Sequence, residues 1–146
     1  MKPYRILITG SRRMRDPGPI IEAFLRIDLE MEGPASLIVV HGAGPGDSET
    51  GAPGCDTLAE SLFSKDWPFP REYDFSKLVE DVDRHPPVPS KFGRWPAAGP
   101  RRNSHMVSLG ADVCLAFPCR QSKGTVDCMT KAWKAGIPTR IWRIEP

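Results

Sequence analysis

This sequence contains no long hydrophobic run. A membrane-spanning helix requires roughly 18 consecutive apolar residues, and no stretch approaches that length, so we expect no interaction with a membrane. The opening residues, MKPYRILITG, also lack the apolar core and the small-residue cleavage site of a secretory signal peptide. We therefore expect that no signal peptide is present.

The cysteines show no paired pattern. The 4 cysteines include no C-x-x-C pair, and the 3 histidines do not complete a metal-binding motif. Reduced thiols are typical of intracellular proteins. We therefore predict a cytoplasmic protein with no disulfide framework, no metal site and no resident cofactor.

Acidic residues are missing from one part of the chain, although the chain as a whole is nearly neutral. The formal net charge of +2 is too small to indicate a nucleic-acid-binding protein. Residues 84–111 contain no Asp or Glu, but they contain the basic residues Arg84, Lys91, Arg94, Arg101 and Arg102. Such a segment is either a solvated face or a surface that attracts phosphate, and the sequence leaves both interpretations open.

Short apolar runs bounded by Gly and Pro alternate with amphipathic stretches. This alternation is typical of repeated strand–helix units, so we predict a doubly wound α/β fold with a mainly parallel sheet of about five strands and helices on both faces. The length of 146 residues fits one domain, spanning 1–146. The expected strands are 4–10, 36–42, 71–75, 111–118 and 137–144, and the expected helices are 17–32, 55–65, 99–110 and 124–136. Residues 76–99 are expected to be irregular because of their prolines.

Four loops that follow expected strands are rich in Gly, small polar or basic residues: 10–13, 41–44, the approach to 101–103, and 118–125. In an open parallel sheet, ligands bind outside the carboxyl ends of the strands, where the strand order reverses. The last loop reaches Gly124 at the start of an expected helix, where free backbone N–H groups bind phosphate. We therefore predict a site for a phosphate-bearing ligand. Neither HGAGPG nor SKGT has the spacing of a dinucleotide fingerprint or a Walker A loop.

Several residues in these segments have a structural alternative. Gly10 can simply relieve strain in a turn, whereas Ser11 can hydrogen-bond a phosphate and Arg12 or Arg13 can pair with the phosphate or stack on a base. Asp56 is either an N-terminal helix cap or a contact to a sugar hydroxyl. Trp95 is either a packing anchor or a lid that stacks on a base. Asp47 and Glu49 either gate the pocket or decorate the surface.

Four segments occur in an order and spacing that resemble a known family. They are ITGSRRMRD, HGAGPG followed by GCDTLAE, AAGPRRNSHMV, and LAFPCRQSKGTVDCM. Together they resemble the YpsA-related branch of the SLOG superfamily, which includes the Lonely-guy phosphoribohydrolases and the DNA-processing protein A family. The resemblance covers about residues 4–142. It implies a Rossmann-like sheet, a pocket for nucleotides or nucleotide-derived ligands, and a homo-oligomer. An exposed Trp133 would support a dimer, and a Trp133 packed against the sheet is the alternative.

The Lonely-guy enzymes share the signature Pro-Gly-Gly-x-Gly-Thr-x-x-Glu and release a base from a nucleoside monophosphate. Pro118, Gly124 and Thr125 match this signature, whereas Cys119 and Arg120 stand in place of two glycines, in a loop that is longer by two residues.

The Glu of the signature is missing. Cys128 stands at its position and Asp127 comes one residue earlier, while Arg101 or Arg102 matches the Arg that works with the Glu. Cleavage of an N-glycosidic bond develops positive charge on the sugar, which a carboxylate stabilises and a neutral thiol does not. Because adjacent helix positions point about 100° apart, Asp127 can replace the Glu only if the helix turns it toward the pocket.

Three functions follow, of which the first is favoured. The protein binds a nucleotide or nucleotide-derived phosphate ligand as a sensor or carrier; or it is a nucleoside 5′-monophosphate N-glycosidase that releases a free base; or it binds single-stranded nucleic acid through residues 84–102. In the first, Asn103 or Asp56 reads the sugar or base. The expected binding residues are Gly10, Ser11, Arg12, Gly42, Gly44, Asp56, Asn103, Pro118, Ser122, Lys123, Gly124 and Thr125, and an enzyme would use Asp127, Arg101 and Arg102 for catalysis.

Overall fold

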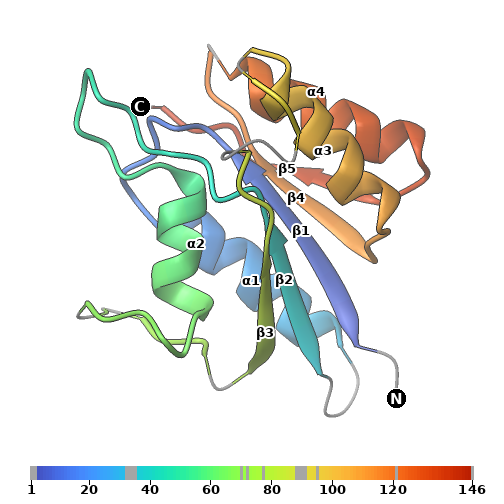
Figure 1. The fold of residues 1–146 in the computed structure, drawn as a ribbon. Coiled ribbons are helices and arrows are strands. Elements are labelled where there is room, and N and C mark those ends of the chain that lie inside the picture. Colours follow the sequence, from blue (N-terminus) through green and yellow to red (C-terminus); the bar gives the residue numbers. More distant parts are fainter. Residues whose placement is uncertain are drawn as a thin grey trace.

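The structure is a computed structural model that describes residues 3–31, 36–69, 71, 73–76, 78–87, 92–94, 96–120 and 122–145. These residues form alternating strands and helices (Figure 1). The strands are β1 (Tyr4–Gly10), β2 (Leu37–His41), β3 (Val79–Arg84), β4 (Val113–Phe117) and β5 (Thr139–Ile141), and the helices are α1 (Gly18–Glu30), α2 (Cys55–Phe63), α3 (Ala98–Ser108) and α4 (Lys123–Lys134). The described strands all run parallel, in the order β3-β2-β1-β4-β5. The predicted Rossmann-like, doubly wound α/β fold is confirmed.

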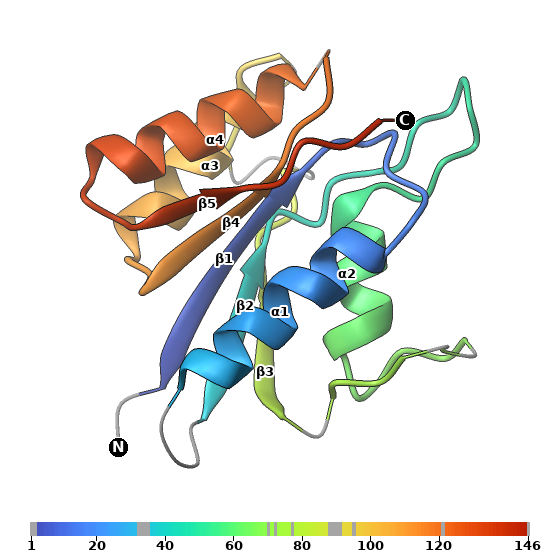
Figure 2. The same ribbon diagram turned by 180° about the vertical axis from the view of Figure 1, so that it is seen from behind.

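Helices cover both faces of the sheet (Figures 1 and 2). α1 and α2 pack on one face, where Ile6 and Ile8 lie in a buried cluster with Phe24 and Phe63. α3 and α4 pack on the other face, in a second buried cluster that includes Leu7. Successive strand residues point to opposite faces. Ile6, Leu7 and Ile8 are consecutive apolar residues and all three are buried, so the middle of β1 is buried on both faces of the sheet.

The third strand differs from its prediction. In the part of the chain that the structure describes, residues 71–75 form no strand, and β3 lies within the segment that was expected to be irregular. β3 is an edge strand that pairs with β2. Its Val79 and Val82 are buried, whereas Glu80 and Asp81 are exposed. An edge strand tolerates charged side chains. Because acidic residues interrupt the short apolar pattern of β3, this pattern did not predict a strand.

The proline-rich segment after β3 agrees with its prediction where it is described. Residues 85–87, 92–94 and 96 lie outside any helix or strand. Trp95 and Lys91 lie outside the described residues, so the two interpretations of Trp95 stay untested.

Two expectations concern the molecular surface. Trp133 on α4 is 70 % exposed, so the alternative that it packs against the sheet is wrong. Within the described ranges, none of the helices combines the length and the apolar composition needed to cross a membrane.

Candidate functional site

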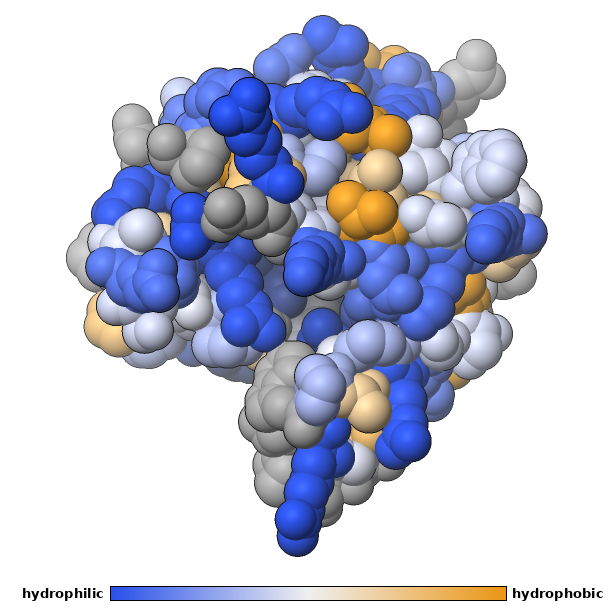
Figure 3. Space-filling view, turned by 90° about the horizontal axis from the view of Figure 1, so that it is seen from above, coloured by the Kyte–Doolittle hydropathy of each residue, from blue (hydrophilic) through white to orange (hydrophobic). Residues whose placement is uncertain are grey.

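The strand order places the carboxyl ends of β1 and β4 side by side. Gly10 at the end of β1 is the register partner of Phe117 at the end of β4, and the remaining strands extend from this pair in opposite directions. A cavity of about 540 Å³ opens beyond these strand ends, where the connections diverge. Figure 3 looks down on this end of the molecule, and most residues around its middle are hydrophilic.

The first turn of α4 forms one wall of the cavity. No described side chain caps this helix, and Ser122 Oγ instead accepts a hydrogen bond of 2.8 Å from the Cys119 N–H. A helix cannot satisfy its first N–H groups internally, so those of Lys123, Gly124 and Thr125 require an external acceptor. These three residues line the cavity. Because the helix dipole also makes this end positive, the turn suits a phosphate group.

Asn103 connects α3 to α4. Its side chain is 3 % exposed, and its Nδ2 donates to the Gly124 carbonyl oxygen at 3.2 Å and to Asp127 Oδ2 at 3.0 Å. Its Oδ1 accepts a 2.9 Å hydrogen bond from Arg102 Nε. Both amide hydrogens of Asn103 are thus used within the protein. We infer that Asn103 positions its neighbours, and the geometry does not favour the expectation that it reads a sugar or base.

Arg102 brings a partly buried positive charge to the same cavity. Burial lowers the pKa of its guanidinium, the charge of Arg12 acts in the same direction, and the Asp56 carboxylate opposes them. Arg102 Nη1 donates to the Gly42 carbonyl oxygen. Among the described residues, no carboxylate forms an ion pair with Arg102. A cation that has lost water without pairing to a carboxylate attracts an anionic ligand.

Asp127 and Cys128 are adjacent but have different surroundings. Asp127 lines the cavity, and its Oδ2 accepts a 2.9 Å hydrogen bond from Lys131 Nζ in addition to the one from Asn103. Cys128 lies on the buried face of α4, and this burial raises the pKa of its thiol to about 11. The thiol is therefore neutral at pH 7. Of these two adjacent residues, Asp127 is the one whose side chain borders the cavity, and the orientation of α4 already places it there.

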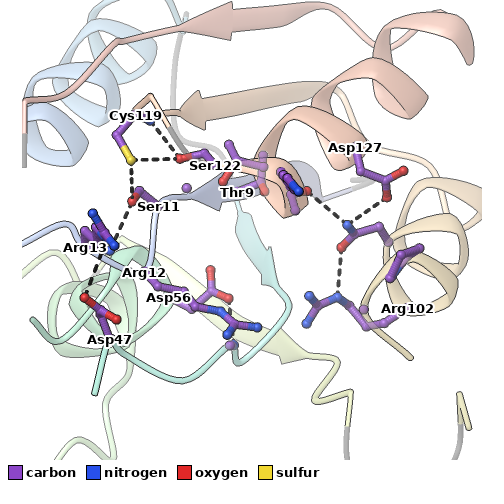
Figure 4. A pocket seen from close by; sticks show the side chains of 18 of the residues that line it. Thr9, Ser11, Arg12, Arg13, Asp47, Asp56, Arg102, Cys119, Ser122 and Asp127 are labelled. Carbon is purple, nitrogen blue, oxygen red and sulfur yellow. Dashed lines mark hydrogen bonds and ion pairs between the residues drawn. The ribbon is translucent and has the colours of Figure 1, made fainter. Parts of the chain in front are cut away.

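The opposite wall of the cavity is formed by the residues that come after β1. The thiol of Cys119 connects this wall to the loop between β4 and α4 (Figure 4). Ser11 Oγ lies 3.0 Å from Cys119 Sγ, and Ser122 Oγ donates to the same sulfur at 3.2 Å. Ser11 Oγ also accepts a hydrogen bond of 3.0 Å from the Arg13 N–H. The Arg13 guanidinium reaches to 3.6 Å from Asp47 Oδ2. These contacts hold the loops after β1 and β4 together.

Asp56 does not cap α2, so the cap prediction is wrong. The N-cap residue is Gly54, and Asp56 Oδ2 instead accepts a 2.8 Å hydrogen bond from the Gly44 N–H. This bond fixes the loop after β2 against the first turn of α2. Asp56 still borders the cavity, together with Arg12 from the loop after β1.

Most of the residues expected at the site line this cavity. They are Gly10, Ser11, Arg12, Gly44, Asp56, Arg102, Asn103, Ser122, Lys123, Gly124, Thr125 and Asp127. Gly42 lies beneath Arg102, and a Cβ at this position would overlap the guanidinium. Arg101 is exposed, and its Nη1 donates to the Phe92 carbonyl oxygen at 3.5 Å. Pro118 is buried at the end of β4.

The cavity is also lined by residues outside the expected binding set, although Arg13 was expected as an alternative to Arg12, and Asp47 was expected either to gate the pocket or to decorate the surface. They are Thr9, Arg13, Asp47, Pro96, Gly99, Pro100 and Cys119. Thr9 and Arg13 flank the Gly-Ser-Arg segment 10–12, and Gly99 and Pro100 belong to the segment AAGPRRNSHMV. The expected site residues next to them in the sequence therefore indicated these positions. Asp47 comes from a long loop, whose position no local pattern predicts.

The loop that carries Gly42 and Gly44 is supported by a buried histidine. The Ala43 N–H donates to His41 Nδ1 at 2.9 Å, so the ring proton lies on Nε2, which contacts Glu60 Oε1 at 2.7 Å. Arg84 also donates to Glu60. Burial alone would raise the pKa of Glu60, but the hydrogen bonds from His41 and Arg84 outweigh it and lower the pKa to about 2.

Glu60 is expected to make the stability of the protein depend on acidic pH. Since its pKa is lower in the folded protein than the ordinary value of 4.5, its contribution is fully present above about pH 4.5 and is lost as the pH falls toward 2. Glu60→Gln should therefore flatten the pH dependence of the unfolding free energy in that range, by up to about 1.4 kcal/mol per pH unit. Urea titrations between pH 2 and 7 would measure this. Glu22→Gln on the exposed face of α1 is the control, and equal slopes for Glu60→Gln and the unmodified protein would contradict the prediction.

The fold and the position of the cavity define a Rossmann-like α/β protein with a candidate ligand site at the reversal of strand order. The chain is 37 % identical over 136 residues to the Gene 61 protein of Mycobacterium phage D29, and the match covers 92 % of each chain. The chain therefore belongs to the same family as this phage protein. No family model matches the chain, and no solved structure matches it.

Proposed function

We propose that this protein binds a nucleotide or nucleotide-derived phosphate ligand, as a sensor or carrier, at the carboxyl ends of β1 and β4. One observation carries the proposal: the uncapped first turn of α4 and the partly buried Arg102 border the same cavity. A backbone N–H cradle and a guanidinium are complementary to phosphate in both charge and geometry.

The other cavity residues suit the rest of such a ligand. The Thr125 hydroxyl and the α4 N–H groups take the phosphate, and Arg102 approaches it from α3. Arg12 and Asp56 lie on the opposite wall, where a carboxylate accepts hydrogen bonds from sugar hydroxyls or base amino groups. The four segments that resemble the YpsA-related branch of the SLOG superfamily support the same class of ligand, and we propose membership of that branch.

The test is a ligand panel read by mass spectrometry. The purified protein is incubated with mononucleotides, cyclic nucleotides and ADP-ribose derivatives, and retained ligand and released base are both measured after ultrafiltration. Intact ligand retained without free base is the expected result. If no member of the panel is retained, the proposed function is wrong.

A second candidate is a nucleotide N-glycosidase, and the position of Asp127 favours it. In this reaction water adds to the anomeric carbon while the base leaves with the bonding electrons and takes a proton. Asp127 borders the cavity, and Asn103 and Lys131 fix its orientation. A carboxylate held in this way can stabilise the positive charge that develops on the sugar.

Asp127→Asn separates the two candidates. If the protein is a glycosidase, the substitution should lower base release about tenfold or more while nucleotide retention stays within about threefold. Single-turnover base release and equilibrium binding would be measured on the same preparation. Glu145→Gln, at the far C-terminal end of the chain, is the control. Base release that survives Asp127→Asn would remove this residue from the mechanism.

A further inference from the structure

A second hollow adjoins the cavity on the outer side of α4. It is an open groove of about 830 Å³, lined by Arg120, Ser122, Lys123, Val126 and Asp127. Ser122, Lys123 and Asp127 also line the cavity. The two hollows therefore border the same first turn of the helix, and a ligand whose phosphate lies at that turn is also next to the groove.

The charge in the groove is positive. Arg120 and Lys123 are both exposed, and neither pairs with a carboxylate in the part of the chain that the structure describes. Among the described residues that line the groove, Asp127 is the one acidic residue, and its carboxylate is already paired with Lys131 at 2.9 Å. Arg120 and Lys123 therefore leave a net positive charge in the groove, beside the neutral Asp127–Lys131 pair. This charge favours the binding of a second anionic group of the ligand.

The groove also offers an apolar surface. Val126 is 47 % exposed, one helical turn after the N-cap residue of α4. An aliphatic side chain at the rim of a polar groove provides a contact for the flat face of a base or for a sugar ring. The groove thus combines the two surfaces that one nucleotide unit requires, a cation for its phosphate and an apolar contact for its base or sugar.

We propose that this groove is a second subsite, which binds the second nucleotide unit of a ligand in which two phosphoryl groups are joined through a nucleoside. The ligand class is then a 5′-phosphorylated dinucleotide, either free or as the end of a longer strand. This inference rests on the proposed function, because it assumes that the first phosphate lies at the start of α4. It adds Arg120 and Val126 to the residues that contact the ligand.

The test compares a 5′-mononucleotide with the 5′-phosphorylated dinucleotide that contains it, by titration calorimetry. We expect the dinucleotide to bind about tenfold more tightly, because it gains a charged contact and an apolar contact. Arg120→Gln and Val126→Asp should each reduce this gain to about twofold or less, with mononucleotide affinity unchanged within about twofold. Arg26→Gln, on α1 at the other face of the sheet, should change neither affinity.

The outcomes separate this inference from the proposed function. If the mononucleotide binds and the dinucleotide binds no better, or if Arg120→Gln weakens both equally, the second subsite is wrong and the proposed function stands. If neither probe binds, the proposed function fails as well. A 5′-phosphorylated trinucleotide distinguishes the two sources of the ligand. If the trinucleotide binds no more tightly than the dinucleotide, the ligand is a free dinucleotide. If the trinucleotide binds more tightly, the ligand is the end of a strand.

Discussion

Replacing Gly124 with aspartate is expected to weaken nucleotide binding at least about 100-fold while making the protein slightly more stable. Gly124 is the second residue of α4, and a Cβ built there meets no other atom within 4 Å. The new carboxylate would occupy the place proposed for the phosphate and repel it, which removes charged hydrogen bonds worth about 3 kcal/mol. The same carboxylate is favourable for folding, because it interacts with the positive end of the helix dipole and replaces a poor helix former.

The opposite signs of these two effects make the result easy to interpret. Calorimetric titration would measure binding, and thermal unfolding would measure stability, with an expected gain of about 0.5–1 kcal/mol. Gly124→Asn is the matched control, since it has nearly the same size without the charge and should lose much less affinity. Normal nucleotide binding by the Gly124→Asp variant would show that the phosphate does not lie at the start of α4.

Arg102→Ala is expected to weaken nucleotide binding about 50-fold, since it removes a partly buried guanidinium from the cavity. Arg101→Ala provides a control within the same helix. The Arg101 side chain is exposed and does not line the cavity, so the nucleotide affinity of this variant should fall about twofold or less. The affinity of Arg102→Lys should lie between those of Arg102→Ala and Arg101→Ala, because lysine retains the charge but cannot donate hydrogen bonds to both Gly42 and Asn103.

Binding constants for the three variants would be measured with the nucleotide that the ligand panel identifies. Circular dichroism would establish that Arg102→Ala remains folded. Equal losses for Arg101→Ala and Arg102→Ala would contradict the assignment, because only one of these side chains reaches the cavity.

Much of the fold was predictable because its strands are apolar and its turns contain Gly and Pro. β1, β2 and β4 contain the continuous apolar runs 6–8, 37–40 and 113–117, which is the pattern of strands buried on both faces. This pattern is absent from β3, which among the described strands pairs with β2 alone and whose exposed residues Glu80 and Asp81 are acidic. No local pattern shows that a short charged segment completes a sheet, because its partner lies about forty residues away in the chain.

The site was predictable as a set of loops and less so as individual side chains. The choice between Arg101 and Arg102, and between Asp127 and Cys128, depends on the rotation of a helix about its axis. Adjacent positions differ by about 100°, and packing against the sheet fixes the rotation. The roles of Asn103 and Asp56 depend on hydrogen-bond partners far away in the chain, which the sequence does not reveal.

The burial of the cysteines has a practical consequence for experiments. Cys55, Cys114 and Cys128 are buried, whereas Cys119 is partly accessible and lies in the cavity wall. A thiol-reactive fluorophore should therefore attach first at Cys119, so the unaltered sequence already carries a single labelling position at the place where the ligand is proposed to enter.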